Sequence, residues 1–149
     1  MPKEKIYIAA DHAGFKMKEE LIKWLEGNEY EVADLGAREL EEDDDYPDFA
    51  IPLAKKVAAA KGRGILICGN AVGVCVTANK VPGIRAAIGY NTSVAKTSRT
   101  DDDANILCLA GRVLSLDFAK AIAGHWLRTP FSNAPRHVRR LKKIEELEK

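Results

Sequence analysis

Short apolar runs and longer amphipathic stretches alternate along this chain. Five runs rich in apolar residues lie at positions 6–10, 30–35, 64–68, 84–88 and 105–110. Runs of this length are typical of strands that are buried on both faces, as they are in a parallel sheet. The pattern therefore predicts five strands.

The stretches between these runs carry apolar residues at helical spacing. Met17, Leu21, Trp24 and Leu25 recur every three or four residues, with lysine and glutamate between them. The same spacing predicts helices near residues 49–58, 93–99 and 116–126, and a last helix from about residue 135. Pro52 is compatible with the helix at residues 49–58 only if that helix begins close by, because proline fits the first turn but not the interior.

Strands that alternate with helices predict a parallel sheet covered on both faces, with right-handed crossovers. We expect one domain over residues 1–149, an α/β fold. Its architecture is a three-layer α/β/α sandwich of the Rossmann or flavodoxin-like kind, with a five-stranded parallel sheet and a C-terminal helix. Ligands bind such sheets outside the carboxyl ends of the strands. Asp11 and Cys68 follow the first and third strands, which are neighbours in a flavodoxin-like order, so we expect them to converge.

Composition narrows the function classes. The chain has 149 residues, 46% hydrophobic and 30% charged, with a formal net charge of +1. This balance gives no overall attraction to nucleic acid, and no run approaches the roughly 18 apolar residues that span a bilayer. Three cysteines without metal-type spacing, and a start that lacks the apolar core of a signal peptide, favour a cytoplasmic protein. Charge is uneven, since residues 39–45 are acidic and residues 136–143 are basic.

Three functions that are common in this fold class need residues that this chain lacks. A dinucleotide site needs G-x-G-x-x-G after the first strand, where this chain has residues 11–15, Asp-His-Ala-Gly-Phe. A thiol phosphatase of the Cys-x5-Arg type needs an arginine where Val74 stands. A phospho-acceptor domain needs an aspartate at the position of Cys68.

Three stretches carry a more specific signal. They are residues 9–15, the loop after Cys68 that leads to Ala-Asn-Lys at 78–80, and the tail Arg-His-Val-Arg-Arg at 136–140. Together they resemble the type B ribose-5-phosphate isomerase family, which includes bacterial galactose-6-phosphate isomerase subunits. Residues 45–47 and 104–107 match as well, so the similarity covers almost the whole chain in order.

The resemblance implies an aldose–ketose isomerase of a phosphorylated sugar that needs no metal or organic cofactor. Cys68 would be the base that removes a proton from the carbon beside the carbonyl, although a thiol on a strand often only packs. Cys75 and Cys108 lack the loop context and are expected in the core.

The loop after Cys68 would supply N–H groups to the enediolate oxygen, although an ordinary strand-to-helix turn can have the same composition. Its members are Gly69, Asn70, Ala71, Val72 and Gly73. Relatives usually have Gly-Thr-Gly where this chain has Gly69-Asn70-Ala71. Asn70 can still donate through its amide, whereas Ala71 restricts the backbone.

Further residues are expected to bind the substrate. Asp11 and His12 would orient sugar hydroxyls or hold the phosphate, and Asp11 could also cap the next helix. Tyr46 would line the pocket or simply pack. Asn79 begins a turn and is as compatible with a structural role as with a functional one.

Arg136 and Arg140 lie four residues apart on one helix face, where their guanidinium groups suit a phosphate. A basic face of this kind is also typical of a solvated helix. In relatives, matching arginines and a histidine like His137 bind the phosphate, and Arg112 can assist. The resemblance also implies that two subunits form each pocket, in a homodimer or a dimer of dimers.

The clearest departure from the family lies at residues 101–102. Ribose 5-phosphate isomerases usually carry His-Asn there, where this chain has Asp101 and Asp102, and that histidine is assigned to opening the sugar ring. Asp101 is a candidate catalytic residue and Asp102 a candidate substrate ligand, and the sequence leaves open whether Asp101 replaces the ring-opening histidine. Since an aspartate is poorly matched to this task near pH 7, open-chain substrates such as four-carbon phosphosugars would be preferred. The alternative is a paralogue that binds phosphosugars with little catalysis.

Overall fold

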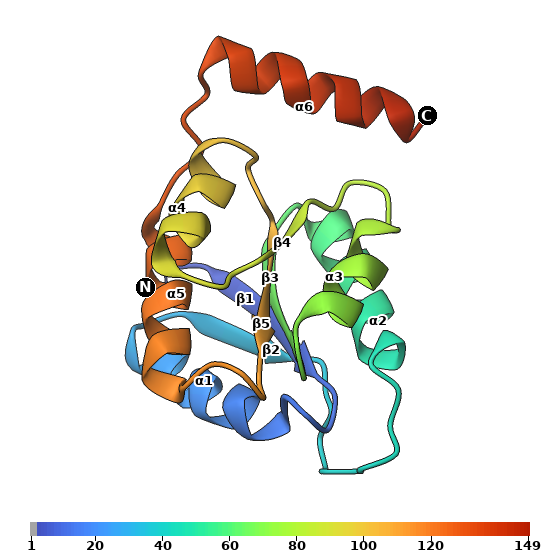
Figure 1. Cartoon of the computed structure of the whole chain (residues 1–149), viewed down its shortest axis with the longest axis vertical. Coiled ribbons are helices and arrows are strands. Elements are labelled where there is room, and N and C mark those ends of the chain that lie inside the picture. The colour runs from blue at the N-terminus through green and yellow to red at the C-terminus, as the bar shows by residue number, and fades with distance from the viewer. Residues whose placement is uncertain (1–2) are drawn as a thin grey trace.

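The computed structural model describes residues 3–149 and shows a five-stranded sheet between two layers of helices (Figure 1). All strand pairs are parallel. The strands are β1 (Lys5–Ala10), β2 (Glu31–Asp34), β3 (Arg63–Cys68), β4 (Ala86–Ile88) and β5 (Ile106–Ala110). The helices are α1 (Phe15–Gly27), α2 (Pro47–Ala60), α3 (Val72–Asn79), α4 (Thr92–Thr100), α5 (Leu116–Arg128) and α6 (Pro135–Leu147). The predicted three-layer α/β sandwich is confirmed.

The sheet is buried on both faces because its strands carry apolar side chains on alternate sides. On β3, Ile65 and Ile67 pack toward α1 and α5, whereas Leu66 and Cys68 pack toward α2 and α3. Two hydrophobic cores result, one on each face, and they explain why the strands read as continuous apolar runs. The helix α6 belongs to neither layer and lies apart from the sheet (Figure 1).

The strand order is β2-β1-β3-β5-β4. Strands β1 and β3 are neighbours, as the flavodoxin-like prediction requires, but the last two strands are exchanged relative to the flavodoxin order 2-1-3-4-5. The exchange places β5 beside β3, so Cys68 pairs with Ala110 at the end of the sheet. The loop after β5 therefore lies next to the loop after β3.

Helix α2 begins at Pro47, a favourable first position for proline. Pro52 then lies inside the helix, beyond the first turn to which the sequence argument confined it. Its missing N–H removes one helical hydrogen bond, the one that would reach the carbonyl of Asp48. The buried residues Leu53 and Val57 hold this helix against the sheet despite that loss.

Two asparagine side chains hold the short strand β4. The Asn79 amide accepts a hydrogen bond from the Ala86 N–H at 2.8 Å and donates one to the Ala86 carbonyl at 3.0 Å. Asn105 accepts from the Arg85 N–H at 2.8 Å and donates to the Gly83 carbonyl at 2.9 Å. Asn79 thus has the structural role, one of the two that the sequence left open.

No helix within residues 3–149 is long and apolar enough to cross a membrane.

Candidate active site

A cleft of about 330 Å³ opens at the carboxyl ends of β1, β3 and β5. This is the edge of the sheet where the sequence predicted a site. The cleft is lined by Asp11, His12, Ala13, Tyr46, Cys68, Gly69, Asn70, Gly73, Arg112 and Val113. Eight of these ten residues were predicted; Ala13 and Val113 were not.

Cys68 is the last residue of β3 and is only 4% exposed. The backbone around it is tied to the end of β5, because the Gly111 N–H donates to the Cys68 carbonyl at 2.8 Å and the Arg112 N–H donates to the Gly69 carbonyl at 3.0 Å. A thiol held in this way has a defined position on the cleft wall. Arg112 brings a positive charge to the same wall.

The loop after Cys68 is shaped to leave backbone N–H groups free. Asn70 accepts a hydrogen bond from the Val72 N–H at 3.0 Å through its side chain. The N–H groups of Asn70 and Ala71 themselves donate to no group within residues 3–149. They are available for an oxyanion, as the predicted role of the loop requires.

Ala71 and Gly73 explain two features of this loop. Ala71 has a φ of 70°, in the left-handed region that costs a residue with a side chain about 1–2 kcal/mol. A side chain at Gly73 would lie 2.6 Å from the Tyr46 ring, so Tyr46 packs directly on the glycine. Both readings of Tyr46 therefore hold, since it packs and also lines the cleft. Ala71 is buried and Val72 is exposed beside the cleft without lining it.

Asp11 is 5% exposed and organises the first loop. One carboxylate oxygen accepts hydrogen bonds from the N–H groups of Ala13 at 3.0 Å and Gly14 at 3.2 Å. Burial raises the pKa of Asp11, and these two hydrogen bonds together with the charge of His12 oppose that rise. Asp11 supports the turn before α1 but is not its cap, because Gly14 holds the N-cap position without a side-chain cap, so the capping alternative is wrong and Asp11 remains on the cleft wall.

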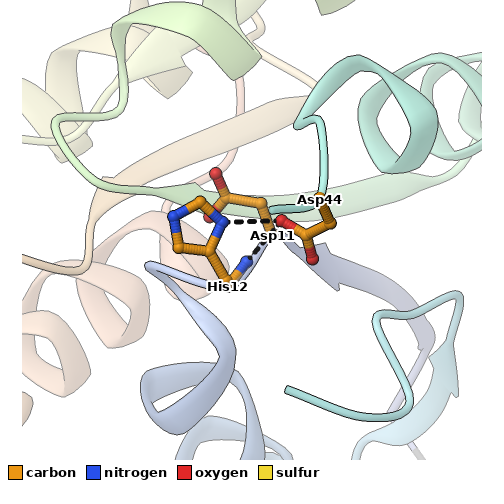
Figure 2. Close-up of side chains that lie close together, drawn as sticks. All are labelled: Asp11, His12 and Asp44. Atoms are coloured by element: carbon orange, nitrogen blue, oxygen red, sulfur yellow. Dashed lines mark hydrogen bonds and ion pairs between the residues drawn. The ribbon is translucent and has the colours of Figure 1, made fainter. Parts of the chain in front are cut away.

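His12 is joined to a residue that the sequence argument missed. Its Nδ1 lies 2.7 Å from Oδ1 of Asp44, and the same oxygen accepts the His12 backbone N–H at 3.0 Å (Figure 2). The hydrogen bond to Asp44 raises the pKa of His12, and the charge of Arg112 acts in the opposite direction. Asp44 lies in the acidic run 39–45, the only signal in the sequence that could have pointed to it.

Asp11, His12 and Asp44 each offer one ligand atom, and these atoms lie within 4.8 Å of one another. Within residues 3–149 this is the one cluster that could hold a metal ion. The short His12–Asp44 contact and the two amides on Asp11 account for the arrangement by hydrogen bonding alone. The absence of a metal cofactor stays a prediction.

The other predicted residues lie on the opposite side of the sheet from the cleft, near the amino-terminal ends of the strands. Asp101 ends α4, just before β5 begins, and its Oδ1 accepts a hydrogen bond from the Thr100 hydroxyl at 2.9 Å and pairs with Nε2 of His137 at 3.4 Å. Arg136 and Arg140 are exposed on α6 beside His137, and Asp102 is exposed next to Asp101. The strand β5, five residues and about 16 Å long, runs from this side of the sheet to the side where Cys68 lies.

The two other thiols are not in the cleft. Cys108 is completely buried, and burial raises its pKa well above the ordinary value. Cys75 is half-buried against the same core, and its pKa is lowered mainly by a hydrogen bond with Cys108. The expectation that both are core residues is confirmed.

Comparison with known proteins settles the family. The model of the Ribose/Galactose Isomerase family matches residues 6–144. The chain belongs to this family. The predicted resemblance is confirmed, and with it the enzyme class, an aldose–ketose isomerase.

Individual relatives are similar over nearly their full length. The ribose-5-phosphate isomerase B of Mycobacterium tuberculosis is 36% identical over 97% of this chain and 90% of its own. The structure of Clostridium thermocellum ribose-5-phosphate isomerase B has a TM-score of 0.93 and 45% identity, covering 97% of both chains. The Mycoplasma genitalium isomerase B structure, with bound ribulose-5-phosphate, has a TM-score of 0.95 and 39% identity, covering 99% of this chain and 98% of that one.

Proposed function

We propose that this protein interconverts ribose 5-phosphate and ribulose 5-phosphate through a cis-enediolate, with Cys68 as the general base. The observation that carries the proposal is the cleft itself, which brings a buried thiol, free loop N–H groups and the Asp11–His12 loop to one sheet edge. A relative of nearly identical fold holds ribulose-5-phosphate in its structure, which supports the choice of a five-carbon sugar.

The chemical step needs a base, an oxyanion site and a returned proton. The Cys68 thiolate takes the proton from C2 of the open-chain aldose, and the electrons of that C–H bond form the C1–C2 double bond. The charge that develops on O1 is stabilised by the N–H groups of Asn70 and Ala71. Cys68 then returns the proton to C1, and the hydroxyl proton of O2 moves to O1 to leave the ketose.

The phosphate needs more positive charge than Arg112 alone supplies within one chain. Arg112 is the arginine that lines the cleft. We propose that Arg136, His137 and Arg140 bind the phosphate in the cleft of a second copy of the chain. Helix α6 supports this arrangement, because it lies apart from the sheet and leaves Ile144 49% and Leu147 87% exposed. The functional unit is then at least a homodimer, in which each cleft is completed by the partner.

Interconversion of the two sugars, followed by NMR or by a coupled assay, tests the proposal. Wild-type protein should convert each sugar into the other, and erythrose 4-phosphate and galactose 6-phosphate serve as alternative substrates. Turnover of erythrose 4-phosphate with little turnover of ribose 5-phosphate would instead support the open-chain preference predicted from Asp101. Binding of all these sugars without turnover of any would contradict the proposal and identify a binding paralogue.

A further inference from the structure

His12 stands between a buried carboxylate and the cleft. Its ring lines the cleft with Cys68, whereas Asp44 lies behind it and is not part of the lining. Figure 2 shows Nδ1 directed at Asp44 and the second ring nitrogen on the opposite side of the ring. The histidine side chain is 24% exposed and the Asp44 side chain 9% exposed. The ring therefore lies between Asp44 and the cleft that Cys68 lines, whereas Asp44 itself borders a second, smaller cavity beside Arg38 and Phe49.

This arrangement fixes which nitrogen of the neutral His12 ring carries the proton. An ionised carboxylate only accepts hydrogen bonds, so the proton of the neutral ring lies on Nδ1 and Nε2 carries the lone pair. A carboxylate on Nδ1 also stabilises the imidazolium that forms when Nε2 takes up a proton. The charges of Asp11 and Asp44 favour that cation and the charge of Arg112 opposes it, with a raised pKa of His12 as the net result.

Asp44 depends on His12 for its hydrogen bonds. Its Oδ1 accepts both hydrogen bonds from His12, and its Oδ2 is buried without a partner within residues 3–149. A buried polar atom without a partner costs about 1–3 kcal/mol, which a residue with a purely structural role would avoid. The carboxylate is thus directed at the imidazole and at nothing else in the described chain.

We propose that His12, oriented by Asp44, opens the furanose ring of the bound aldose phosphate, the task for which residues 101–102 lack the family's histidine. This inference rests on the proposed function. His12 is the catalytic residue and Asp44 is a positioning residue. His12 Nε2 takes the proton from the C1 hydroxyl and the C1–O1 double bond forms. The C1–O4 bond breaks with its electrons on O4, and the imidazolium returns the proton to O4.

The Asp101–His137 pair is the competing candidate. His137 Nε2 lies 3.4 Å from Asp101, so the ring nitrogen that would act on a sugar is already paired. The proposed function also assigns His137 to the phosphate on C5, away from the C1 hydroxyl and O4 where the ring opens. In contrast, His12 lines the same cleft as Cys68, where the opened sugar must be used.

The experiment compares the two directions of the reaction as the enzyme concentration is raised. Ribulose 5-phosphate cannot close a furanose ring because its terminal oxygen carries the phosphate, so only the aldose requires ring opening. The variants are Asp44→Asn and His12→Gln, with His137→Gln as the competitor. Asp43→Asn is the matched control, since Asp43 is an exposed carboxylate of the same loop.

With ribose 5-phosphate, we expect Asp44→Asn and His12→Gln to lose about 10²-fold or more in rate at high enzyme concentration. Their rates should reach a plateau as enzyme is added, because spontaneous ring opening then supplies the substrate. With ribulose 5-phosphate, they should lose less than about tenfold. Asp43→Asn should match the wild type in both directions.

Equal losses in both directions, with rates that stay proportional to enzyme, would overturn the proposal and leave His12 and Asp44 with a binding or structural role. A plateau for His137→Gln but not for His12→Gln would overturn it in favour of the other pair. A wild-type protein inactive in both directions would contradict the proposed function, and the ring-opening step with it.

Discussion

The two ends of the sheet in this chain are built for different tasks. At the carboxyl edge, the Cys68 thiol, His12 and Asp11 line one cleft, and Asp44 lies close behind His12. At the amino edge, Arg136 and Arg140 lie exposed on α6 beside the paired Asp101 and His137. One edge thus holds proton-transfer groups at fixed positions and the other presents positive charge. In the proposed mechanism the two sets of groups act on the same phosphosugar, the carboxyl-edge groups from one chain and the α6 cations from a second copy.

The carboxyl edge is tested most severely by removing its base. We expect Cys68→Ala to lower kcat by about 10²–10⁴ while phosphosugar affinity changes little, because the proposed phosphate ligands lie elsewhere. Cys75→Ala, a thiol outside the cleft, is the control and should keep nearly full activity. Steady-state kinetics and calorimetry give the two quantities. Wild-type turnover by Cys68→Ala would remove the chemistry from this edge.

The amino edge should show the opposite kinetic signature. Arg136→Ala removes a charge-assisted hydrogen bond worth about 1.5–3 kcal/mol, so we expect KM to rise about 10–100-fold with a smaller change in kcat. Lys142→Ala, on another face of α6, should leave KM unchanged. A fall in kcat with an unchanged KM would show that α6 does not bind the substrate.

Mixing two inactive proteins tests whether the edges cooperate across chains. Cys68→Ala chains lack the base, and chains with both Arg136→Ala and Arg140→Ala lack the phosphate ligands. In a random mixture of refolded dimers, about a quarter of the clefts should combine an intact thiol with intact arginines. Activity should return to about that fraction of wild type. A mixture that stays inactive would place both groups in the cleft of a single chain.

The acid limb of the pH profile reports on His12. Because Asp44 raises the pKa of His12, the neutral form that accepts a proton should predominate only above the ordinary histidine value of 6.5. We expect kcat/KM for ribose 5-phosphate to fall on the acid side at that raised pKa. Asp44→Asn should move the limb to lower pH, because the stabilisation of the cation is lost. If the acid limb of Asp44→Asn stays at the wild-type pH, that limb reports the titration of another group.

The smallest effect concerns the loop backbone. Ala71→Gly relieves the left-handed strain, although glycine gains more freedom in the unfolded chain. The net stabilisation should be about 0.5–1 kcal/mol, or a few degrees in Tm. Gly73→Ala should instead destabilise, because its new methyl group would collide with the Tyr46 ring. Thermal denaturation measures both, and a lower Tm for Ala71→Gly would show that the loop is not strained.

The sequence was sufficient for the layers and for part of the cleft. Apolar runs marked all five strands because both faces of the sheet are buried, and strand ends located Asp11 and Cys68. Local patterning does not encode strand order, so the exchange of β4 and β5 could not be read from it. Asp44 was missed because its partner His12 lies 32 residues away and an acidic loop usually faces solvent.

The spacing of residues along the chain could not predict the pairing of Asp101 with His137 either. This pair joins the end of α4 to a helix more than thirty residues later. Resemblance to a family placed both residues in one functional set without showing that they touch. Long-range side-chain contacts of this kind depend on how loops close over a finished sheet, and neither periodicity nor motif spacing reports on that.

The Asn79 amide has a consequence for how the protein behaves at high concentration. Strand β4 is the outermost strand on its side, and an outer strand with free N–H and carbonyl groups invites pairing with another chain. The Ala86 groups that would offer such pairing are both occupied by Asn79. One side chain therefore takes the place of a neighbouring strand at Ala86 and hinders edge-to-edge pairing there. Deamidation of Asn79 would remove the amide donor and free the Ala86 carbonyl, while the new carboxylate could still accept from the Ala86 N–H.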